Sequence, residues 1–386
     1  MEGKKDTMKV KGISPWQQIK KRFRKNKLAL AGMYFIIISF LLAVFAFVLI
    51  PDKTPMANRM NLSISNQPPG FNIVMLKVPK SYVEKTNFLQ QLFEGRNDAF
   101  NYIALSTFHL SDSTIYYREF TGENNILSSP ENKIPLSRLG NNMTQNSYQI
   151  IDESIVQKTF YFGTDRYGRD MLSRLIAGTR VTLSIGLVAV IISLITGIFF
   201  GSIAGFFRGR IDSIIVWLIN VVWSIPTLLL VITITLVLGK GFEQVFIAVG
   251  LTMWVDVARI VRSQMFSIRE LEYISAGRSM GFRNLRIIIL HMLPNVIGPV
   301  LVIAASNFST AILLEAGLSF LGIGAQPPTP SWGAMIKENF GYIIIPGSAY
   351  LALLPGMAIM LLTMAFTFVA NGLRDAIDSK TQVTLV

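Results

Sequence analysis

The residues of this chain that could do chemistry begin with a small group of charged side chains. Asp165, Arg169 and Asp170 lie within six residues of one another. A metal or catalytic site would need further acids or histidines beside them. The whole chain has only two histidines, His109 and His291, and no cysteine. We therefore interpret the three residues as a structural ion-pair network.

Motifs that bind nucleotides or zinc are missing from the sequence. It contains neither the G-x-x-x-x-G-K-[ST] phosphate loop nor an H-E-x-x-H pair. Without cysteine, it can form neither a disulfide nor a thiolate metal site. We expect a chain that is not an enzyme, binds no cofactor and does not itself hydrolyse ATP.

Composition indicates a membrane protein. Hydrophobic residues make up 51% of the 386 residues and charged residues only 15%, which is too few charges for the water-facing surface of a chain this long. The net charge of +13 lies beside apolar stretches, and residues 1–27 carry ten Lys or Arg. This pattern is typical of cytoplasmic segments next to a membrane span and not of a nucleic-acid-binding surface. Membrane lipid is therefore an expected partner, and nucleic acid is not.

Six stretches are long and apolar enough to cross a bilayer core of about 30 Å. They are residues 28–50, 181–206, 213–239, 245–261, 292–314 and 348–370. The first is too long for the apolar core of a signal peptide, so we expect a retained anchor. Pro226, in the third, is interpreted as a tolerated kink rather than as a gate.

Three ionisable residues fall in or beside these stretches. Asp256 and Arg259, in the fourth, have a spacing that allows an ion pair on one helix face. Glu315 directly follows the fifth. It could cap the turn that follows, pair with a neighbouring helix, or line a pathway through the membrane. These alternatives stay open.

The basic N-terminus predicts the orientation of the chain. An even number of spans returns the C-terminus to the cytoplasmic side. The segment 262–291, with five arginines and two glutamates, agrees with this orientation, whereas the four arginines between 166 and 180 would lie outside. Residues 14–23 place their apolar side chains on one face, as a helix in the inner membrane interface would. An unstructured basic leader is the alternative.

Residues 51–160 are polar, with ten basic and ten acidic side chains. Runs of β-formers predict strands at 73–78 and 114–120. The spacing of Phe88, Leu89, Leu92 and Phe93 predicts a short amphipathic helix. We expect this segment to form a small α+β domain outside the cytoplasm.

The segment between the fourth and fifth spans predicts a short helix that ends at a glycine. Ile274, Arg278 and Phe282 recur every four residues, and Gly281 follows the helical pattern. Small residues at 275–277 would let another protein approach closely. The pattern alone favours neither a cytoplasmic docking site nor an ordinary loop helix.

This segment resembles the EAA loop of binding-protein-dependent ABC importer permeases. Ser275, Ala276 and Gly277 fall on the Glu-Ala-Ala positions, and Gly281 falls on the glycine that follows. Ser275 lacks the acid expected there, and Glu272, about one turn earlier, is the candidate substitute. The resemblance implies contact with an ATPase through Glu272, Ser275, Ala276, Gly277, Arg278, Gly281 and the final pair, Leu293 and Pro294.

Three further stretches narrow the resemblance to the C-type subunit of the dipeptide and oligopeptide permeases. Residues 162–174 are similar to that family's signature before the second core helix, residues 314–324 with 327–333 to a later signature, and residues 372–375 to its usual ending. The implied fold is an all-α membrane protein with six transmembrane helices, the type I ABC importer permease fold, here with an inserted extracytoplasmic α+β domain. Asp165, Arg169 and Glu315 are then candidate contacts of the pathway or of the binding protein.

The resemblance implies a permease subunit that moves short peptides across the cytoplasmic membrane. Its partners would be a homologous second permease, ABC ATPase subunits and an extracytoplasmic solute-binding protein. The expected order is a cytoplasmic tail with an interfacial helix (1–27), the first transmembrane helix (28–50), the extracytoplasmic insertion (51–160), a permease core (161–376) and a second cytoplasmic tail (377–386).

Other classes of protein remain open. A stand-alone secondary transporter would be expected to carry coupling residues at mid-membrane and inverted repeats, and neither is evident. A membrane-anchored sensor or adhesion protein would explain residues 51–160 but not six spans. Nickel, heme or another small solute is the alternative to peptides as substrate.

Overall fold

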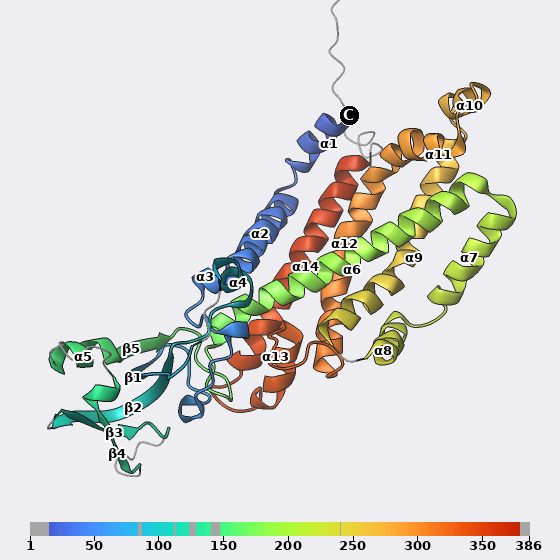
Figure 1. The fold of residues 1–386 in the computed structure, drawn as a ribbon. Helices are drawn as coiled ribbons and strands as arrows, with labels where there is room; N and C mark the ends of the chain where they lie inside the picture. The colour runs from blue at the N-terminus through green and yellow to red at the C-terminus, as the bar shows by residue number, and fades with distance from the viewer. Residues whose placement is uncertain are drawn as a thin grey trace, which may run out of the picture.

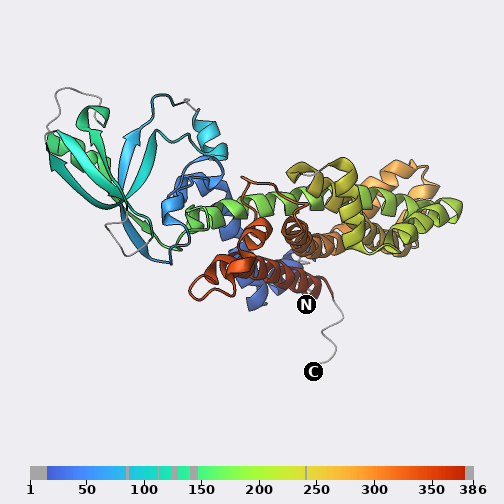
Figure 2. The same cartoon turned by 90° about the horizontal axis from the view of Figure 1, so that it is seen from below.

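Long helices and one β-sheet occupy opposite ends of the molecule (Figure 1). The computed structural model describes residues 15–83, 87–111, 113–122, 129–139, 147–239 and 241–378. Seen from below, the sheet projects beyond the helices and is joined to them by the first part of the longest helix (Figure 2). The expected tail 377–386 lies almost wholly outside the described residues, as do residues 1–14 of the expected leader.

The helices follow the apolar stretches of the sequence. Their bounds are α1 Pro15–Phe23, α2 Lys27–Val44, α3 Ala46–Leu49, α6 Met171–Phe207, α7 Gly209–Trp223, α8 Thr227–Leu238, α9 Phe242–Arg269, α10 Glu272–Ser279, α11 Asn284–Arg286, α12 Leu293–Phe320, α13 Trp332–Asn339 and α14 Tyr350–Ile377. Within the described residues, five helical segments are long and apolar enough to cross a membrane: α2, α6, α9, the run from α11 to α12, and α14. A sixth span exists only if α7 and α8 are counted together.

The third predicted span, 213–239, is not a continuous helix. α7 ends at Trp223, α8 begins at Thr227, and their axes differ by 90°. Pro226 lies at the break, where its ring and its missing N–H prevent the helix from continuing. The prediction of a tolerated kink was therefore wrong: the proline separates two helices.

The polar segment contains the predicted strands and helix. Strands β1 Phe71–Pro79, β2 Phe100–Ser111, β3 Thr114–Glu119, β4 Glu131–Pro135 and β5 Ile155–Phe160 form an antiparallel sheet in the order β4-β3-β2-β1-β5. Helix α5 Ser147–Ser154 packs beside the sheet, whereas α4 Phe88–Glu94 packs against α3. Alternate residues of β1 enter two apolar clusters, as strand geometry requires. Ile73 and Met75 pack with Ile64, whereas Leu76 packs with Leu105 and Ile115.

The packing of α6 against α9 depends on glycines spaced four residues apart. Gly197, Gly201 and Gly205 lie on the face of α6 that contacts α9. A Cβ at Gly201 would lie 2.5 Å from the carbonyl oxygen of Ala258. In a bilayer, close approach of backbones through small residues is a main source of helix association. These glycines therefore set the distance between the two helices.

We expect Gly201→Ala to destabilise the protein, because the added methyl group meets the α9 backbone. The loss should be about 1–3 kcal/mol, as for other overpacked interiors. Gly356→Ala in α14 is the matched control, since its Cβ would meet no atom within 4 Å, and better helix propensity should make it neutral or stabilising by up to about 1 kcal/mol. Denaturant unfolding in mixed micelles measures both changes. Equal stability of the two variants would contradict the packing argument.

Candidate functional site

The segment predicted to contact an ATPase forms a short helix that projects from the end of the bundle opposite the sheet (Figure 1). Ile274 and Gly277 of α10 are buried. The remaining predicted contact residues of α10 are exposed: Glu272, Ser275, Ala276 and Arg278. Gly281 follows the helix with φ of +78°, a conformation that glycine adopts without strain. The predicted glycine stop is confirmed.

Contacts to α6 and to the segment that leads into α12 hold α10 in place. Ile274 belongs to the apolar cluster that contains Phe206 at the end of α6. The guanidinium of Arg278 lies over the Phe206 ring, 5.1 Å from its centre. Phe282, just after α10, stacks on His291 with ring centres 5.8 Å apart. A force applied to α10 therefore reaches both α6 and the segment that leads into α12.

The end of the predicted motif lies at the start of α12. Leu293 is its first residue and is half-buried, and Pro294 is exposed. Proline suits the first turn of a helix, where backbone N–H groups have no partner within the helix. The turn before it, Ile287–Met292, is a π-helix, which leaves α11 and α12 joined in one long segment.

Residues Gly277 to Gly281 also match the letters G-x-S-x-G of a hydrolase elbow. In that elbow the serine sits on a sharp turn between a strand and a helix. Here Ser279 is the last residue of α10, and its hydroxyl donates a hydrogen bond to the carbonyl of Ser275 at 3.2 Å. The hydroxyl of Ser279 therefore bonds to a carbonyl of its own helix and does not have the placement of a nucleophile.

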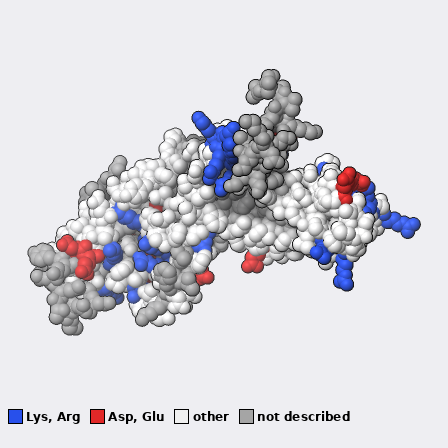
Figure 3. All heavy atoms as spheres, turned by 90° about the horizontal axis from the view of Figure 1, so that it is seen from above, with Lys and Arg blue, Asp and Glu red and all other residues white. Residues whose placement is uncertain are grey.

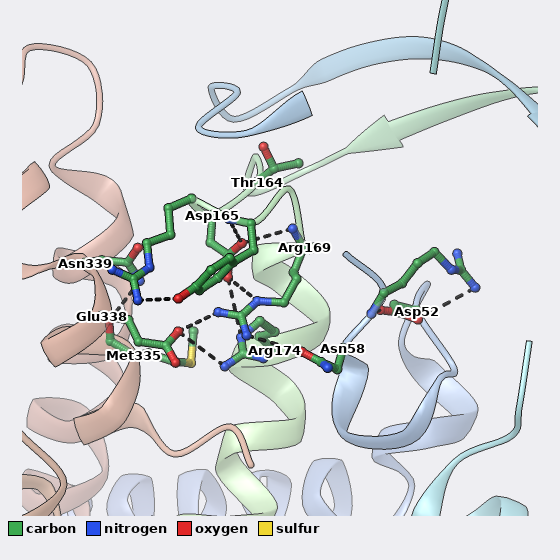
Figure 4. Close-up of polar contacts among 12 residues, drawn as sticks. Asp52, Asn58, Thr164, Asp165, Arg169, Arg174, Met335, Glu338 and Asn339 are labelled. Atoms are coloured by element: carbon green, nitrogen blue, oxygen red, sulfur yellow. Dashed lines mark hydrogen bonds and ion pairs between the residues drawn. The ribbon is translucent and has the colours of Figure 1, made fainter. Parts of the chain in front are cut away.

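Asp165 and Arg169 form a buried ion pair near the sheet (Figure 4). Arg169 Nε donates to Asp165 Oδ2 at 2.6 Å, and both side chains are 1% exposed. Arg169 also contacts Glu338 of α13 at 2.5 Å. Arg174 of α6 lies 3.7 Å from each of the two acids. Two positive and two negative charges thus balance in one buried cluster, as the interpretation of an ion-pair network requires.

Asp170 lies outside this cluster. Its carboxylate accepts a hydrogen bond from the backbone N–H of Ser173 at 3.0 Å and from the Ser173 hydroxyl, so it caps the N-terminus of α6. This cap explains why α6 begins at Met171, ten residues before the predicted start of the second span.

The sequence did not reveal the other half of the cluster. Glu338 is 169 residues from Arg169, and Asn58, which accepts from Arg169 at 3.3 Å, is 111 residues away. Arg174 appeared only as one of several arginines. No local spacing connects such residues, because only the packing of α13 and the segment 51–70 against α6 brings them together.

Glu315 is fully buried near the end of α12. Its carboxylate accepts a hydrogen bond from the Ser319 hydroxyl at 2.7 Å. The same hydroxyl oxygen accepts from the backbone N–H of Ala325 at 3.1 Å. Of the alternatives for Glu315, this placement favours stabilisation of the turn after α12 over exposure to a pathway.

A polar cavity of about 440 Å³ lies between the sheet and the start of α6. Asp52, Arg59, Asp98 and Lys158 line it. Arg59 pairs with Asp98 and lies 3.7 Å from Asp52. Burial lowers the pKa of Lys158, because desolvation penalises its charged form, and Arg59 lowers this pKa further. The acidic and basic side chains that line the cavity offset one another, so the cavity has no strong net charge of either sign.

The predicted ion pair between Asp256 and Arg259 is not formed. Arg259 lies over the ring of Trp223, 4.0 Å from its centre. Asp256 is exposed and makes neither a hydrogen bond nor an ion pair with any residue that the structure describes. The stacking of the guanidinium on an indole ring, a favourable cation–π contact, displaces the expected pairing.

We expect Glu338→Gln to lower the free energy of unfolding by about 3–5 kcal/mol, because it leaves a buried positive charge without compensation. Glu270→Gln is the control. It breaks an ion pair with Arg208 in which Glu270 is 67% exposed, and such pairs contribute about 0–1 kcal/mol. Thermal or denaturant unfolding of the purified variants compares the two. A similar loss of unfolding free energy in both variants would show that the buried cluster stabilises the protein no more than an exposed ion pair does.

Comparison with known proteins agrees with the motifs. The family "Binding-protein-dependent transport system inner membrane component" matches residues 197–383. The family "N-terminal TM domain of oligopeptide transport permease C" matches residues 14–69. Among solved structures, the MetNI methionine ABC transporter aligns with 53% of this chain and 97% of its own, with 19% identity and a TM-score of 0.42.

Curated relatives are more similar in sequence. The dipeptide transport system permease protein DppC of Alkalihalophilus pseudofirmus is 40% identical over 57% of this chain and 72% of its own. The di/tripeptide permease DppC of Pseudomonas aeruginosa is 41% identical over 58% and 73%, and the oligopeptide permease OppC of Bacillus subtilis is 37% identical over 58% and 72%. The chain therefore belongs to the binding-protein-dependent ABC importer permeases, in the dipeptide and oligopeptide group, as a multi-pass protein of the inner membrane.

Proposed function

We propose that this chain is the permease subunit of an importer that brings short peptides into the cytoplasm with energy from separate ATPase subunits. The observation that carries this proposal is the placement of α10. Its exposed residues project beyond the bundle at the end opposite the sheet. A helix so placed, anchored to α6 and α12, is suited to receive motion from a cytoplasmic partner.

ATP binding and hydrolysis in the partner would move α10 between two positions. The contact of Arg278 with Phe206 would pass that movement to α6, and the stacking of Phe282 on His291 would pass it toward α12. The partner must bind the two positions of α10 with different free energies, because equal contact in both would shift no equilibrium. Glu272, in the first turn of α10, is the acidic contact in place of Ser275.

The charge distribution supports a cytoplasmic location for both termini. α1, α10 and the end of α14 lie at the same end of the bundle (Figure 1). Viewed from that end, basic side chains gather over α1, and both basic and acidic side chains lie around α10 (Figure 3). Lysine and arginine concentrate in cytoplasmic segments of membrane proteins. We therefore assign residues 1–27 and 377–386 to the cytoplasm.

This orientation assigns residues 51–160 to the outside as an α+β insertion in the permease. A solute-binding protein would approach from the same side, and the buried pair of Asp165 and Arg169 supports the surface it would meet. Residues 28–50 and 161–376 then form the membrane part.

A homologous second permease is the expected neighbour of the broken span. Trp217 of α7 is 65% exposed and Val237 of α8 is 82% exposed. Large apolar side chains of this kind suit a surface covered by another membrane subunit or by lipid. The chain itself is proposed to have no enzymatic activity and no bound cofactor. Short peptides are the proposed substrate, since the relatives are named for dipeptides, tripeptides and oligopeptides.

Two glycines offer a matched test of the coupling role. Gly281, after α10, and Gly347, before α14, have φ of +78° and +81°, and a Cβ at either would meet no atom within 4 Å. Asp at either position imposes the same backbone strain, but only Gly281 lies at the proposed ATPase contact. We expect Gly281→Asp to abolish peptide-stimulated ATPase activity or loosen the ATPase, and Gly347→Asp to retain both.

The measurement is affinity purification of the tagged chain from membranes in mild detergent, followed by identification of bound subunits and an ATPase assay. Purification of the unaltered chain alone, without ATPase activity under conditions that preserve complexes, would contradict the proposed function. A stand-alone transporter would then be the function to test. Equal behaviour of the two glycine variants would contradict only the coupling role of α10 and would leave the proposed transport function standing.

A further inference from the structure

Asp256 is an acidic residue in the middle of a membrane-spanning helix. It lies in α9 (Phe242–Arg269), thirteen residues after Glu243 and six before Arg262. At about 1.5 Å per residue, it is roughly 20 Å from the first of these charges and 9 Å from the second. Arg259, at about 4.5 Å along the helix, is the nearest charge. Asp256 therefore lies inside the apolar stretch of α9, nearer to its C-terminal end than to its N-terminal end.

No described residue neutralises this carboxylate. Arg259 is held over Trp223, and Arg262 forms its ion pair with Asp212 of α7 at 2.5 Å. Asp256 is exposed on the surface of the chain. A charged side chain facing lipid at this depth costs several kcal/mol, so such residues face water-filled cavities or partners.

Asp256 lines a small cavity of about 100 Å³ at the break between α7 and α8. Trp223 and Thr227 border the cavity on either side of the break. Asn307 and Thr310 of α12 complete a polar wall. The side-chain NH2 group of Asn307 has no hydrogen-bond partner among the described residues. An unpaired carboxylate and an unsatisfied amide thus border one cavity beside a discontinuous span, an arrangement typical of transporter binding sites.

We propose that Asp256 forms a binding point for a cationic group, the α-ammonium of a peptide, on the translocation pathway. The proposal rests on the proposed function, because the peptide passes only if the chain is an importer permease. A carboxylate favours an ammonium group through charge and through a charge-assisted hydrogen bond. Asn307 adds hydrogen-bonding capacity without charge, which suits the peptide bond next to that ammonium.

Two other arrangements would neutralise the same carboxylate. A basic residue of a second permease could cover it, and the cavity would then be closed to water. Arg259 could leave Trp223 and pair with Asp256, and the cavity would then have little net charge. Two measurements therefore distinguish the proposal from these arrangements. One is whether a water-soluble reagent can enter the cavity, and the other is whether the cavity attracts a cationic reagent over an anionic one.

The chain has no cysteine, so one introduced thiol reports on this cavity. Thr310→Cys is the reporter, because Thr310 is exposed and its hydroxyl bonds only the Ser306 carbonyl of its own helix at 3.2 Å. The assembled complex, first shown to contain its ATPase subunits, is treated with the cationic reagent MTSET and the anionic reagent MTSES. Labelling is measured without nucleotide and with ATP and vanadate, and rates are expressed relative to those of a free thiol in solution.

We expect labelling in at least one state, with MTSET favoured over MTSES. Adding Asp256→Asn should reduce that preference about fivefold, the change for reagents of opposite charge roughly 8 Å from a carboxylate in a water-like medium. Glu243→Gln, in the first turn of the same helix, should leave the preference unchanged. The proposal would be overturned if Thr310→Cys were labelled neither without nucleotide nor with ATP and vanadate. It would also be overturned if the protein with Thr310→Cys as its only change showed no preference for MTSET.

A transport measurement tests the ligand. Uptake of trialanine by vesicles that contain the complex and its binding protein should fall at least about tenfold in Asp256→Asn, the effect of losing a hydrogen bond to a charged group. The binding protein is the same in every sample, so its affinity cannot cause the difference. Glu243→Gln should transport normally. Unchanged uptake in Asp256→Asn, in a complex that couples ATP hydrolysis to peptide, would refute this inference while leaving the proposed function intact.

Discussion

Helices in a bilayer gain no hydrophobic free energy from packing on one another, so they must be held together by close van der Waals contact. The rest of this structure depends on that contact between α6 and α9. The glycines of α6 let its backbone approach Val257 and Ala258 of α9 closely. This contact fixes the rotation of α9 about its axis. Once Val257 and Ala258 face α6, the neighbouring Asp256 must point away from α6, because it lies about 100° around the helix from Val257 and about 160° from Ala258. The same packing that joins the two helices therefore exposes the acidic residue beside the broken span.

A second kind of interaction determines where α6 begins. Hydropathy suggests a start near residue 181, because Asp170, Arg174 and Arg180 interrupt the apolar pattern. The structure extends the helix to Met171 since each charge has a partner: Asp170 caps the first turn, and Arg174 lies between Asp165 and Glu338. Arg180 lies over the rings of Phe47 and Phe93. Charges that pair in a buried cluster do not end a helix, whereas hydropathy counts them as if they were solvated.

Local patterns in the sequence were sufficient for the elements that depend on neighbours in the chain. Runs of β-formers predicted β1 and β3, and Gly281, within a pattern that recurs every four residues, predicted the end of α10. Features that depend on distant residues were not predictable in this way. Glu338 joins Arg169 only through tertiary packing. Pro226 was recognised, but its local sequence does not distinguish a kink from a 90° break, which depends on what α7 and α8 pack against.

The sheet is fastened to the helices by hydrogen bonds that leave little freedom between them. The backbone N–H of Thr164 donates to the carbonyl of Gln67 at 3.0 Å. The hydroxyl of Tyr350, the first residue of α14, donates to the same carbonyl at 2.6 Å. On the other side of the segment, Asp52 donates its backbone N–H to the hydroxyl of Ser173 in α6 at 3.0 Å.

Those bonds join the segment before β1 to the starts of both α6 and α14. Movement of either helix therefore displaces the base of the sheet, and a protein bound to the sheet is held at a defined position over the bundle. The other end of α6 contacts α10 through Phe206, its second-to-last residue. One continuous helix of 37 residues thus runs from the base of the sheet to α10 and is long enough to cross a membrane. For the coupling role that we propose for α10, a rigid helix anchored at both ends is a direct mechanical link, and flexible linkers at either end would weaken it.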